Sequence, residues 1–418
     1  MPWPCAAHQG SNGSDFLRIL FFAEAVTLAH VARLLVLAAA AAKAGDEVII
    51  ACHDRYRGFI ESAGLSWLPL QSIGSRQFAQ ALAKGDPLFD LQTLRDYVRQ
   101  DLQLIEGVEP DLIVGDFRLS LSVSARLARA RYATVTNAYW SPFVAERRFP
   151  MPVLPLSRRL PLPLARALFR AFAPAVMAMH CMPLNRLRRE NGLPSLGADL
   201  RRVYTDADHT LYADAPGMFA LRDLPPTHCH LGPVVWSPPV VTPSWWNSLP
   251  DDRPTVYVTL GSSGDPTVLG RVLDALADLS LTAIASSAGA PIHTRDYAAN
   301  VHVAEYLPGF LAAARSRLVI CNGGSPTAQQ ALAAGVPVLG IAGNMDQFLN
   351  MDAIVRREAG RLLRADRITP TMLRKAVIGL IDNPRAHEAA RELSAVFALH
   401  DAGTHFNRFL RGLDQAAI

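Results

Sequence analysis

The sequence predicts an α/β protein with two doubly wound parallel-sheet domains. Short apolar runs alternate with amphipathic helical segments along most of the chain, as in parallel sheets covered by helices on both faces. The 418 residues are more than one hydrophobic core usually organises. Residues 231–254 are rich in proline, serine and tryptophan and interrupt the periodic pattern, which indicates a linker between two domains.

The first half begins with a strand–helix–strand unit. Residues 17–22 form an apolar run, 28–44 have helical periodicity with Gly45 suited to end the helix, and 48–51 form the next run. The apolar stretch at 25–44 resembles a membrane span, but His30, Arg33 and Lys43 interrupt it and strands flank it, so we interpret it as a buried helix. Further strands are predicted at 112–114 and 133–136, with a helix through 124–130 between them.

The second half resumes the pattern with a strand at 255–260 and a helix in which Val268, Val272 and Leu276 share a face. The turn between them, 261–264, is a position from which Ser262 or its backbone could reach a phosphate. We therefore divide the chain into an extension expected to be disordered (1–15), an N-terminal domain (16–232), a linker (233–253), a C-terminal domain (254–385) and C-terminal helices (386–418).

Composition narrows the classes of function. The net charge of +4 and pI near 8.9 come without a dense basic tract interleaved with aromatic residues, which argues against nucleic acid and favours anionic ligands or a membrane surface. The five cysteines are scattered without metal-ligand spacing, so neither a disulfide framework nor a zinc site is expected. Residues 1–15 lack the pattern of a secretion signal. We expect a cytoplasmic protein.

The most informative stretch runs from 301 to 350. A strand at 301–303 places Tyr306 at the carboxyl edge of a sheet, where its ring could stack on a base. A second strand at 317–321 leads into Asn322-Gly323-Gly324-Ser325 and a helix at 326–334, so this turn can present backbone amides and a helix N-terminus to a diphosphate. Ser325 suits the N-cap and Pro326 the first helical position. A third strand at 337–341 places Asp346 and Gln347 on the following loop, where they suit sugar hydroxyls.

This ordered set resembles the donor-binding signature of the family 1 glycosyltransferases, and the resemblance covers most of the chain. It implies two Rossmann-like domains facing a cleft (the GT-B architecture), with acceptor bound by the first domain and nucleotide sugar by the second. It also implies that Tyr306 stacks on the base, that Asp346 and Gln347 hold the sugar, and that the last helices cross back to the N-terminal domain. Asn350 matches a following asparagine of the signature.

Three positions depart from the family pattern. Asn322 replaces a histidine that donates to the diphosphate, and can still donate through its uncharged amide. Pro326 replaces a glycine and removes one N–H, which leaves Thr327 and Ala328 as the backbone donors. Gln330 replaces a glutamate that holds the ribose hydroxyls. Nucleotide-sugar binding is still expected, while the choice of nucleotide and sugar stays open.

The family carries a catalytic histidine at the start of its first helix, which His30 matches. Inverting transfer needs a base for the acceptor hydroxyl, and an imidazole needs a partner for its second nitrogen. Asp116 ends the predicted strand at 111–116, where the family often has the aspartate of its His-Asp pair. Both residues would lie at the carboxyl ends of neighbouring strands. Glu24, in the loop that leads to His30, is the reserve base, because Ala29 stands where the family commonly has glycine.

Three other features carry weaker expectations. Asp206-Ala207-Asp208 resembles a metal-binding pair, but we expect amides and a helix end to stabilise the leaving diphosphate without a metal ion or other cofactor. His228-Cys229-His230 is interpreted as a loop. The segment 147–189 interleaves arginines with apolar residues and could contact an anionic membrane, line an acceptor pocket or simply pack on its own domain. The arginines interleaved with apolar residues are Arg158, Arg159, Arg166, Arg170, Arg186, Arg188 and Arg189.

The sequence therefore predicts an inverting glycosyltransferase that moves a sugar from a UDP- or dTDP-linked donor to a hydroxyl of an apolar small molecule or lipid, in the cytoplasm or at the inner face of the membrane. Two alternatives remain at this point. A nucleotide-sugar epimerase could use the same architecture. A non-catalytic partner protein that only binds nucleotide sugars would fit the three departures in the donor signature.

Overall fold

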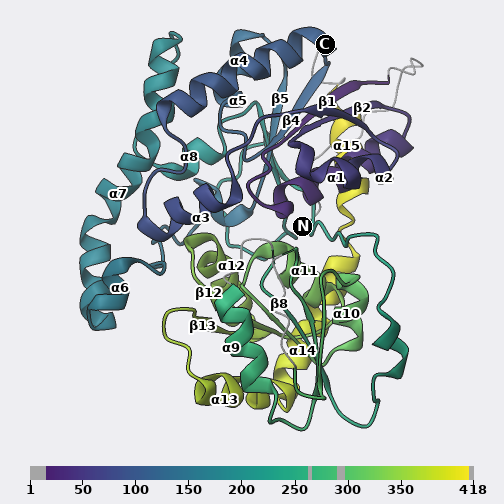
Figure 1. Ribbon diagram of the computed structural model, residues 1–418. Coiled ribbons are helices and arrows are strands. Elements are labelled where there is room, and N and C mark those ends of the chain that lie inside the picture. The colour runs from purple at the N-terminus through teal and green to yellow at the C-terminus, as the bar shows by residue number, and fades with distance from the viewer. Residues whose placement is uncertain (1–15, 262–265, 290–296, 414–418) are drawn as a thin grey trace.

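A computed structural model describes residues 16–261, 266–289 and 297–413. Ser262 and the extension predicted at 1–15 lie outside these residues. Figure 1 shows two α/β domains, one above the other, each built on a parallel sheet. The predicted fold class is confirmed.

The described residues of the N-terminal domain form a seven-stranded sheet with the order β3-β2-β1-β4-β5-β6-β7. Its strands are β1 (Arg18–Ala23), β2 (Glu47–Cys52), β3 (Ser66–Pro69), β4 (Leu112–Asp116), β5 (Tyr132–Thr136), β6 (His209–Tyr212) and β7 (His228–His230). The loop predicted at 228–230 is wrong, because these residues pair in parallel with β6 as an edge strand. A three-residue polar strand has no apolar alternation by which the sequence could reveal it.

Helices cover both faces of this sheet. They are α1 (Leu28–Lys43), α2 (Arg57–Ser62), α3 (Ser75–Lys84), α4 (Leu91–Val108), α5 (Leu121–Leu127), α6 (Pro155–Arg159), α7 (Leu162–Glu190) and α8 (Leu200–Tyr204), with short 3-10 turns η1 (Asp54–Tyr56) and η2 (Ala138–Trp140). The predicted buried helix is α1: Val31, Leu34 and Leu37 are fully buried in the core that includes β1 and β4.

The C-terminal domain has a six-stranded sheet within the described residues, ordered β10-β9-β8-β11-β12-β13. Its strands are β8 (Thr255–Thr259), β9 (Thr282–Ser286), β10 (Val301–Ala304), β11 (Leu318–Cys321), β12 (Val338–Ala342) and β13 (Gly360–Arg364). Its helices are α9 (Pro266–Leu276), α10 (Gly309–Arg315), α11 (Ser325–Ala333), α12 (Met345–Arg356), α13 (Pro370–Ile381) and α14 (Pro384–Ala398). Between β7 and β8 the chain has one short 3-10 turn, η3 (Ser244–Ser248).

The C-terminal helices divide between the two domains. In Figure 1, α15 (Ala402–Leu413), in yellow, lies beside α1 in the upper domain, while α14 lies in the lower domain. Phe406 and Leu410 of α15 are fully buried in the core of the N-terminal domain. By contrast, Leu393 and Phe397 of α14 pack with α11. The expectation that all helices after 386 pack on the N-terminal domain therefore needs correction, since within the described residues α15 does so and α14 packs on the C-terminal domain.

The order of strands places a switch point at the centre of each sheet. In the N-terminal sheet β1 lies between β2 and β4, and in the C-terminal sheet β8 lies between β9 and β11. Connections on the two sides of such a point diverge, which leaves a crevice at the carboxyl ends of the strands where open α/β sheets bind ligands.

Candidate active site

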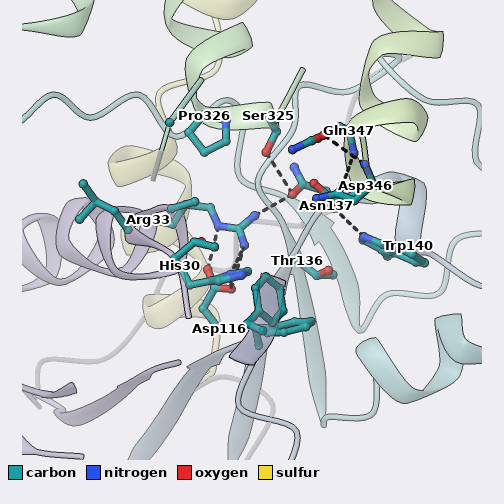
Figure 2. A pocket seen from close by; sticks show the side chains of 18 of the residues that line it. His30, Arg33, Asp116, Thr136, Asn137, Trp140, Ser325, Pro326, Asp346 and Gln347 are labelled. Carbon is teal, nitrogen blue, oxygen red and sulfur yellow. Dashed lines mark hydrogen bonds and ion pairs between the residues drawn. The ribbon is translucent and has the colours of Figure 1, made fainter. Parts of the chain in front are cut away.

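A cavity of about 320 Å³ lies between the two domains at these carboxyl ends. Segments that follow β1, β4 and β5 line one wall, and segments that follow β8, β11 and β12 line the other. Figure 2 shows the centre of the cavity, where side chains of both walls meet. Within the described residues, these predicted site residues line it: His30, Asp116, Tyr306, Asn322, Gly324, Ser325, Thr327, Gln330, Asp346 and Gln347.

The structure brings together the predicted pair of His30 and Asp116. His30 lies in the first turn of α1, and Asp116 is the last residue of β4, the neighbour of β1. The Nδ1 atom of His30 is 2.8 Å from Oδ1 of Asp116. Nδ1 also lies 3.0 Å from Nη2 of Arg33, which can only donate, so the roles of the two ring nitrogens depend on the tautomer. In the tautomer with the proton on Nδ1, the imidazole donates to Asp116 and Nε2 carries the lone pair. This is the tautomer that a general base requires.

Arg33 completes this cluster. From the sequence we had interpreted it only as one of the charged residues that interrupt the apolar stretch at 25–44. Its Nε donates to Oδ2 of Asp116 at 2.7 Å, and its Nη2 donates to Oδ1 at 2.8 Å. The guanidinium is almost completely buried. The i, i+3 spacing from His30 places both side chains on the same face of α1, and this was the signal available in the sequence.

Asn137 connects the cluster to the opposite domain, and no sequence pattern singled it out. It follows β5 directly, so it lies at the same carboxyl edge as Asp116. Its Oδ1 accepts from Nη1 of Arg33 at 2.7 Å and from the hydroxyl of Ser325 at 3.3 Å. Figure 2 shows Arg33 between Asp116 on one side and Asn137 on the other.

A buried carboxylate lies behind Asn137. Asp214 accepts hydrogen bonds from Nδ2 of Asn137, from the backbone N–H of Ala138 and from Nε2 of Gln329 on α11. Burial raises the pKa of Asp214 to about 6, although the hydrogen bonds from Ala138 and Asn137 oppose the shift. Gln329 also donates to the backbone of Ala213 and accepts from that of Val234, so it joins α11 to the N-terminal domain and the linker.

The residue after Asp116 has a strained backbone. Phe117 adopts a φ of 60°, which bulky side chains rarely adopt. Its ring stacks on the imidazole of His30, with centroids 4.8 Å apart and an interplanar angle of 5°. The next residue, Arg118, is fully buried and forms ion pairs with Glu24 and Asp101.

These ion pairs correct the role expected for Glu24. Its carboxylate is 3.0 Å from Nη1 of Arg118, and it is fully buried outside the lining of the cavity. Burial raises the pKa of Glu24, and Arg118 opposes this shift. Glu24 therefore holds the loop in place and is not positioned as a reserve base.

On the opposite wall, local hydrogen bonds shape the turn after β11. The Oδ1 atom of Asn322 accepts from the N–H of Gly324 at 3.0 Å, and Nδ2 of Asn350 donates to the carbonyl of Gly323 at 2.8 Å. Gly323 has a φ of +85° and lies behind the turn, against Met351. Gly323 therefore shapes the backbone of the turn and does not line the cavity.

The start of α11 differs by one residue from the prediction. Gly324 is the N-cap and Ser325 is the first helical residue, because Gly324 has extended dihedral angles and the helix begins after it. The Ser325 hydroxyl bonds to Asn137 and does not cap the helix. The N–H of Ala328 donates to the carbonyl of Gly324, so the helix already uses one of the two amides expected to face a phosphate.

Asp346 and Gln347 lie in the first turn of α12, not on the loop before it. The N-cap is Asn344, and Oε1 of Gln347 accepts from the N–H groups of Gly343 and Asn344 in a capping box. Oδ1 of Asp346 accepts from the Tyr139 hydroxyl and from Nε1 of Trp140, each at 2.9 Å. In this structure both side chains are engaged by the protein.

Tyr306 and Gln330 of this wall contact residues of the N-terminal domain and of the linker. The ring of Tyr306 makes an edge contact with Phe59, with centroids 6.4 Å apart, and Phe59 makes a closer edge contact with Trp236. Nε2 of Gln330 donates to the carbonyl of Trp236. Trp236 lines the cavity, although the sequence had suggested only a linker there.

The inner end of the cavity is apolar and aromatic. Phe117, Trp140 and Tyr204 line it with side chains of α3, α7 and α8. Helix α7 packs on its own domain, where Met177, Cys181 and Leu184 are buried, and its Phe169, Val176, Met177 and His180 also line the cavity. By length and composition alone, α7 is the one helix in the described residues that could cross a membrane.

The side chains of the Asp206-Ala207-Asp208 and His228-Cys229-His230 motifs bond to other parts of the protein. Asp206 forms ion pairs with Arg126 and the buried Arg188, while Asp208 accepts from the backbone of Tyr132. His228 and His230 bond to Tyr212 and to the carbonyl of Asp214, respectively. In the part of the chain that the structure describes, no group of three or more His, Cys, Asp or Glu side chains could hold a metal ion.

Known proteins resemble this chain over nearly its whole length. The erythromycin biosynthesis protein CIII-like C-terminal domain matches residues 270–402. A PGL/p-HBAD biosynthesis glycosyltransferase of Mycobacterium tuberculosis (strain H37Ra) is 48% identical over 386 residues, which cover 92% of this chain and 90% of that protein. A PGL/p-HBAD biosynthesis rhamnosyltransferase of Mycobacterium bovis (strain BCG) is also 48% identical over 386 residues, which cover 92% and 85%.

A solved structure has the same fold. Spinosyn rhamnosyltransferase SpnG complexed with thymidine diphosphate gives a TM-score of 0.69 at 17% identity, and the match covers 94% of this chain and 100% of SpnG. Together, the 48% identity to named glycosyltransferases and the two facing parallel-sheet domains show that this chain belongs to the family 1 glycosyltransferases of the GT-B fold and is a glycosyltransferase.

Proposed function

We propose that this glycosyltransferase moves a sugar, with inversion, from a UDP- or dTDP-linked donor to a hydroxyl group of an apolar small-molecule or lipid acceptor. One observation carries the proposal. The His30–Asp116 pair lies on one wall of the cavity, and the Asn322–Thr327 turn with the N-terminus of α11 lies on the other. A base and an anion-binding turn that face one cavity suit attack on one side of a sugar and departure of a diphosphate on the other.

His30 acts as the base in this proposal. Its Nε2 takes the proton of the acceptor hydroxyl as the oxygen attacks the anomeric carbon. Nδ1 keeps its proton and its hydrogen bond to Asp116, whose carboxylate stabilises the imidazolium that forms. Arg33 fixes both oxygens of that carboxylate, so the imidazole has one orientation.

The donor lies along the C-terminal wall. Tyr306 stacks on the base, Gln330 contacts the ribose, and Asn322, Ser325 and Thr327 face the diphosphate. Asp346 and Gln347 receive the sugar. The departing diphosphate is stabilised by hydrogen-bond donors and by the positive end of the α11 dipole, without a metal ion in the mechanism. The thymidine diphosphate in SpnG and the name of the M. bovis relative make dTDP-rhamnose the first donor to test.

The acceptor lies at the inner, aromatic end of the cavity. Trp140, Tyr204 and Phe117 offer large apolar surfaces, and the ring of Phe117 stacks on His30, which favours an apolar acceptor whose hydroxyl reaches Nε2. Polar acceptors would leave these surfaces without matching contacts.

Transfer can be tested with purified protein, a panel of UDP- and dTDP-sugars, and apolar acceptors that carry a hydroxyl. Mass spectrometry detects the product, and nuclear magnetic resonance gives its anomeric configuration. We expect inversion, and we expect His30→Ala to lower kcat by about 10²- to 10⁴-fold while donor binding persists. A product of retained configuration, or full turnover by His30→Ala, would contradict the mechanism. Conversion of the sugar nucleotide without an acceptor would instead identify an epimerase.

Peripheral contact with an anionic membrane through 147–189 is part of the proposal. Four exposed apolar side chains support it, namely Leu164, Phe172, Met179 and Met182, which lie on the side of α7 away from its buried face. Co-sedimentation with vesicles that contain phosphatidylglycerol should capture the protein, and Phe172→Glu with Met182→Glu should abolish capture. Equal recovery with neutral phosphatidylcholine vesicles would contradict an anionic preference.

A further inference from the structure

We propose that Arg33, from the acceptor domain, contributes the positive charge that faces the donor diphosphate. The inference rests on the proposed function and extends it to a residue of the opposite domain. The turn from 322 to 327 consists of Asn, Gly, Gly, Ser, Pro and Thr, so it has no cationic side chain. A diphosphate enclosed between two domains needs compensation beyond neutral donors, because burying unpaired charge is costly.

Few cationic groups are available. Among the described residues that line the cavity, the candidates are His30, Arg33, Arg118 and His180. Arg118 already has two carboxylate partners and no exposed surface. His180 lies on α7, which lines the apolar end. His30 has the role of proton acceptor, so Arg33 is the remaining guanidinium.

The geometry directs Arg33 toward the donor turn. Its Nη1 and the hydroxyl of Ser325 donate to the same atom, Oδ1 of Asn137, at 2.7 and 3.3 Å. The Oδ1 atom of Asn137 therefore connects the guanidinium to Ser325, the first residue of α11 (Figure 2). Nη1 has two N–H groups, and in the described part of the chain only one of them has a partner. A phosphate oxygen at the start of α11 can take the second.

During transfer, the charge of the cluster formed by Arg33, Asp116 and His30 changes so that it stabilises the leaving diphosphate. Before reaction, the Arg33–Asp116 pair has no net charge, but Nη1 of its cationic member lies on the side of Asn137 and Ser325, and the mechanism requires a neutral imidazole. The acceptor proton then moves to Nε2 of His30, while the bond between the anomeric carbon and the diphosphate oxygen breaks with its electron pair on the diphosphate. The cluster of Arg33, Asp116 and imidazolium gains one positive charge as the leaving group gains negative charge, so their attraction is strongest in the transition state.

Binding of dTDP and UDP without acceptor tests the inference, because no proton transfer occurs. Isothermal titration calorimetry of the wild type selects the tighter nucleotide. Arg33→Gln would leave the buried carboxylate of Asp116 without its arginine partner. The decisive variant is therefore Arg33→Gln with Asp116→Asn, which removes both charges and leaves the net charge unchanged. We expect this double variant to bind the diphosphate about 10- to 100-fold more weakly. The corresponding nucleoside, which has no phosphate, should bind as it does to the wild type.

Three outcomes would overturn the inference. If the double variant binds the diphosphate as tightly as the wild type, Arg33 only positions Asp116 and His30, and the proposed function stands. If the wild type binds neither dTDP nor UDP, the proposed donor class fails and the inference fails with it.

A third substitution, Asn322→His, can be added to the double variant to return a cationic group to the turn. We expect it to restore part of the affinity for the diphosphate at pH 6, where an imidazole carries charge, and less at pH 8. Equal affinity at both pH values would contradict charge as the cause.

Discussion

The two walls of the cavity are held in different ways. On the N-terminal wall, His30, Arg33 and Asn137 are held by other side chains, and their bonds join residues 83 to 104 positions apart. On the C-terminal wall, Asn322 and Gln347 bond to backbone groups within four residues, and these local bonds shape the two turns. Ser325 and Asp346 of this wall bond instead across the cavity, to Asn137 and to Tyr139 and Trp140. The first wall thus depends on compensation of buried charge, and the second on local backbone conformation. Substitutions on the two walls should therefore destabilise the protein for different reasons.

The largest effect on stability is expected for Asp116→Asn, which leaves the buried Arg33 without an anionic partner. We expect the free energy of unfolding to fall by about 3–5 kcal/mol. Urea denaturation followed by near-ultraviolet circular dichroism measures the change. The double variant with Arg33→Gln should recover much of the loss, and an equal loss in both variants would show that unpaired charge is not the cause.

A smaller, pH-dependent effect is expected for Asp214. The pKa of Asp214 is about 6 in the folded protein and about 3.9 in an unfolded chain. Between these values the folded state binds more protons, so this contribution to stability is complete below about pH 4 and is lost as the pH rises through 6. Compared with Asp214→Asn, the wild type should lose on the order of 2–3 kcal/mol over this interval.

Urea denaturation at pH 4.5, 5.5 and 6.5 measures the difference between wild type and Asp214→Asn. Asp278→Asn is the matched control, because Asp278 is exposed and its loss should leave the pH profile of the wild type unchanged. Parallel profiles for wild type and Asp214→Asn would contradict the assignment.

On the C-terminal wall, Gly323→Ala tests the backbone. The φ of +85° is unfavourable for alanine, and an added Cβ would lie 2.7 Å from Cγ of Met351. We expect a loss of about 1–3 kcal/mol in stability together with weaker nucleotide binding. Gly107→Ala is the control, because a Cβ there meets nothing within 4 Å and Gly107 lies inside α4. Equal effects at both positions would show that the turn does not depend on glycine.

The smallest effect is expected where the two walls touch. Trp140→Phe removes the indole N–H that donates to Asp346, while the Tyr139 hydroxyl still donates to the same oxygen. We expect a loss of about 1 kcal/mol or less in thermal or urea denaturation. Trp140→Phe combined with Tyr139→Phe should cost more than the sum of the single variants, since Asp346 then loses both donors. Additive losses would show that the carboxylate finds other partners.

The sequence predicted the site best where neighbouring residues of one continuous segment form it. The turn at 322–325 and the pair Asp346 and Gln347 are framed by strands and helices whose periodicity is visible in the sequence. Errors there were small, such as the start of α11 at Ser325 and the placement of Asp346 in a helical turn. Local hydrogen bonds and caps depend on residues three or four positions apart, so their pattern is written into the order of the chain.

The sequence by itself also determined that His30 and Asp116 meet, because the carboxyl ends of neighbouring parallel strands share one edge. Only the tertiary structure decided that Arg33 binds both oxygens of Asp116, that Asn137 joins this cluster to Ser325, and that Glu24 is held by Arg118. Each of these contacts depends on how whole sheets and helices pack against each other. A side chain finds a partner a hundred residues away only after that packing has positioned both backbones, and no local pattern encodes the result.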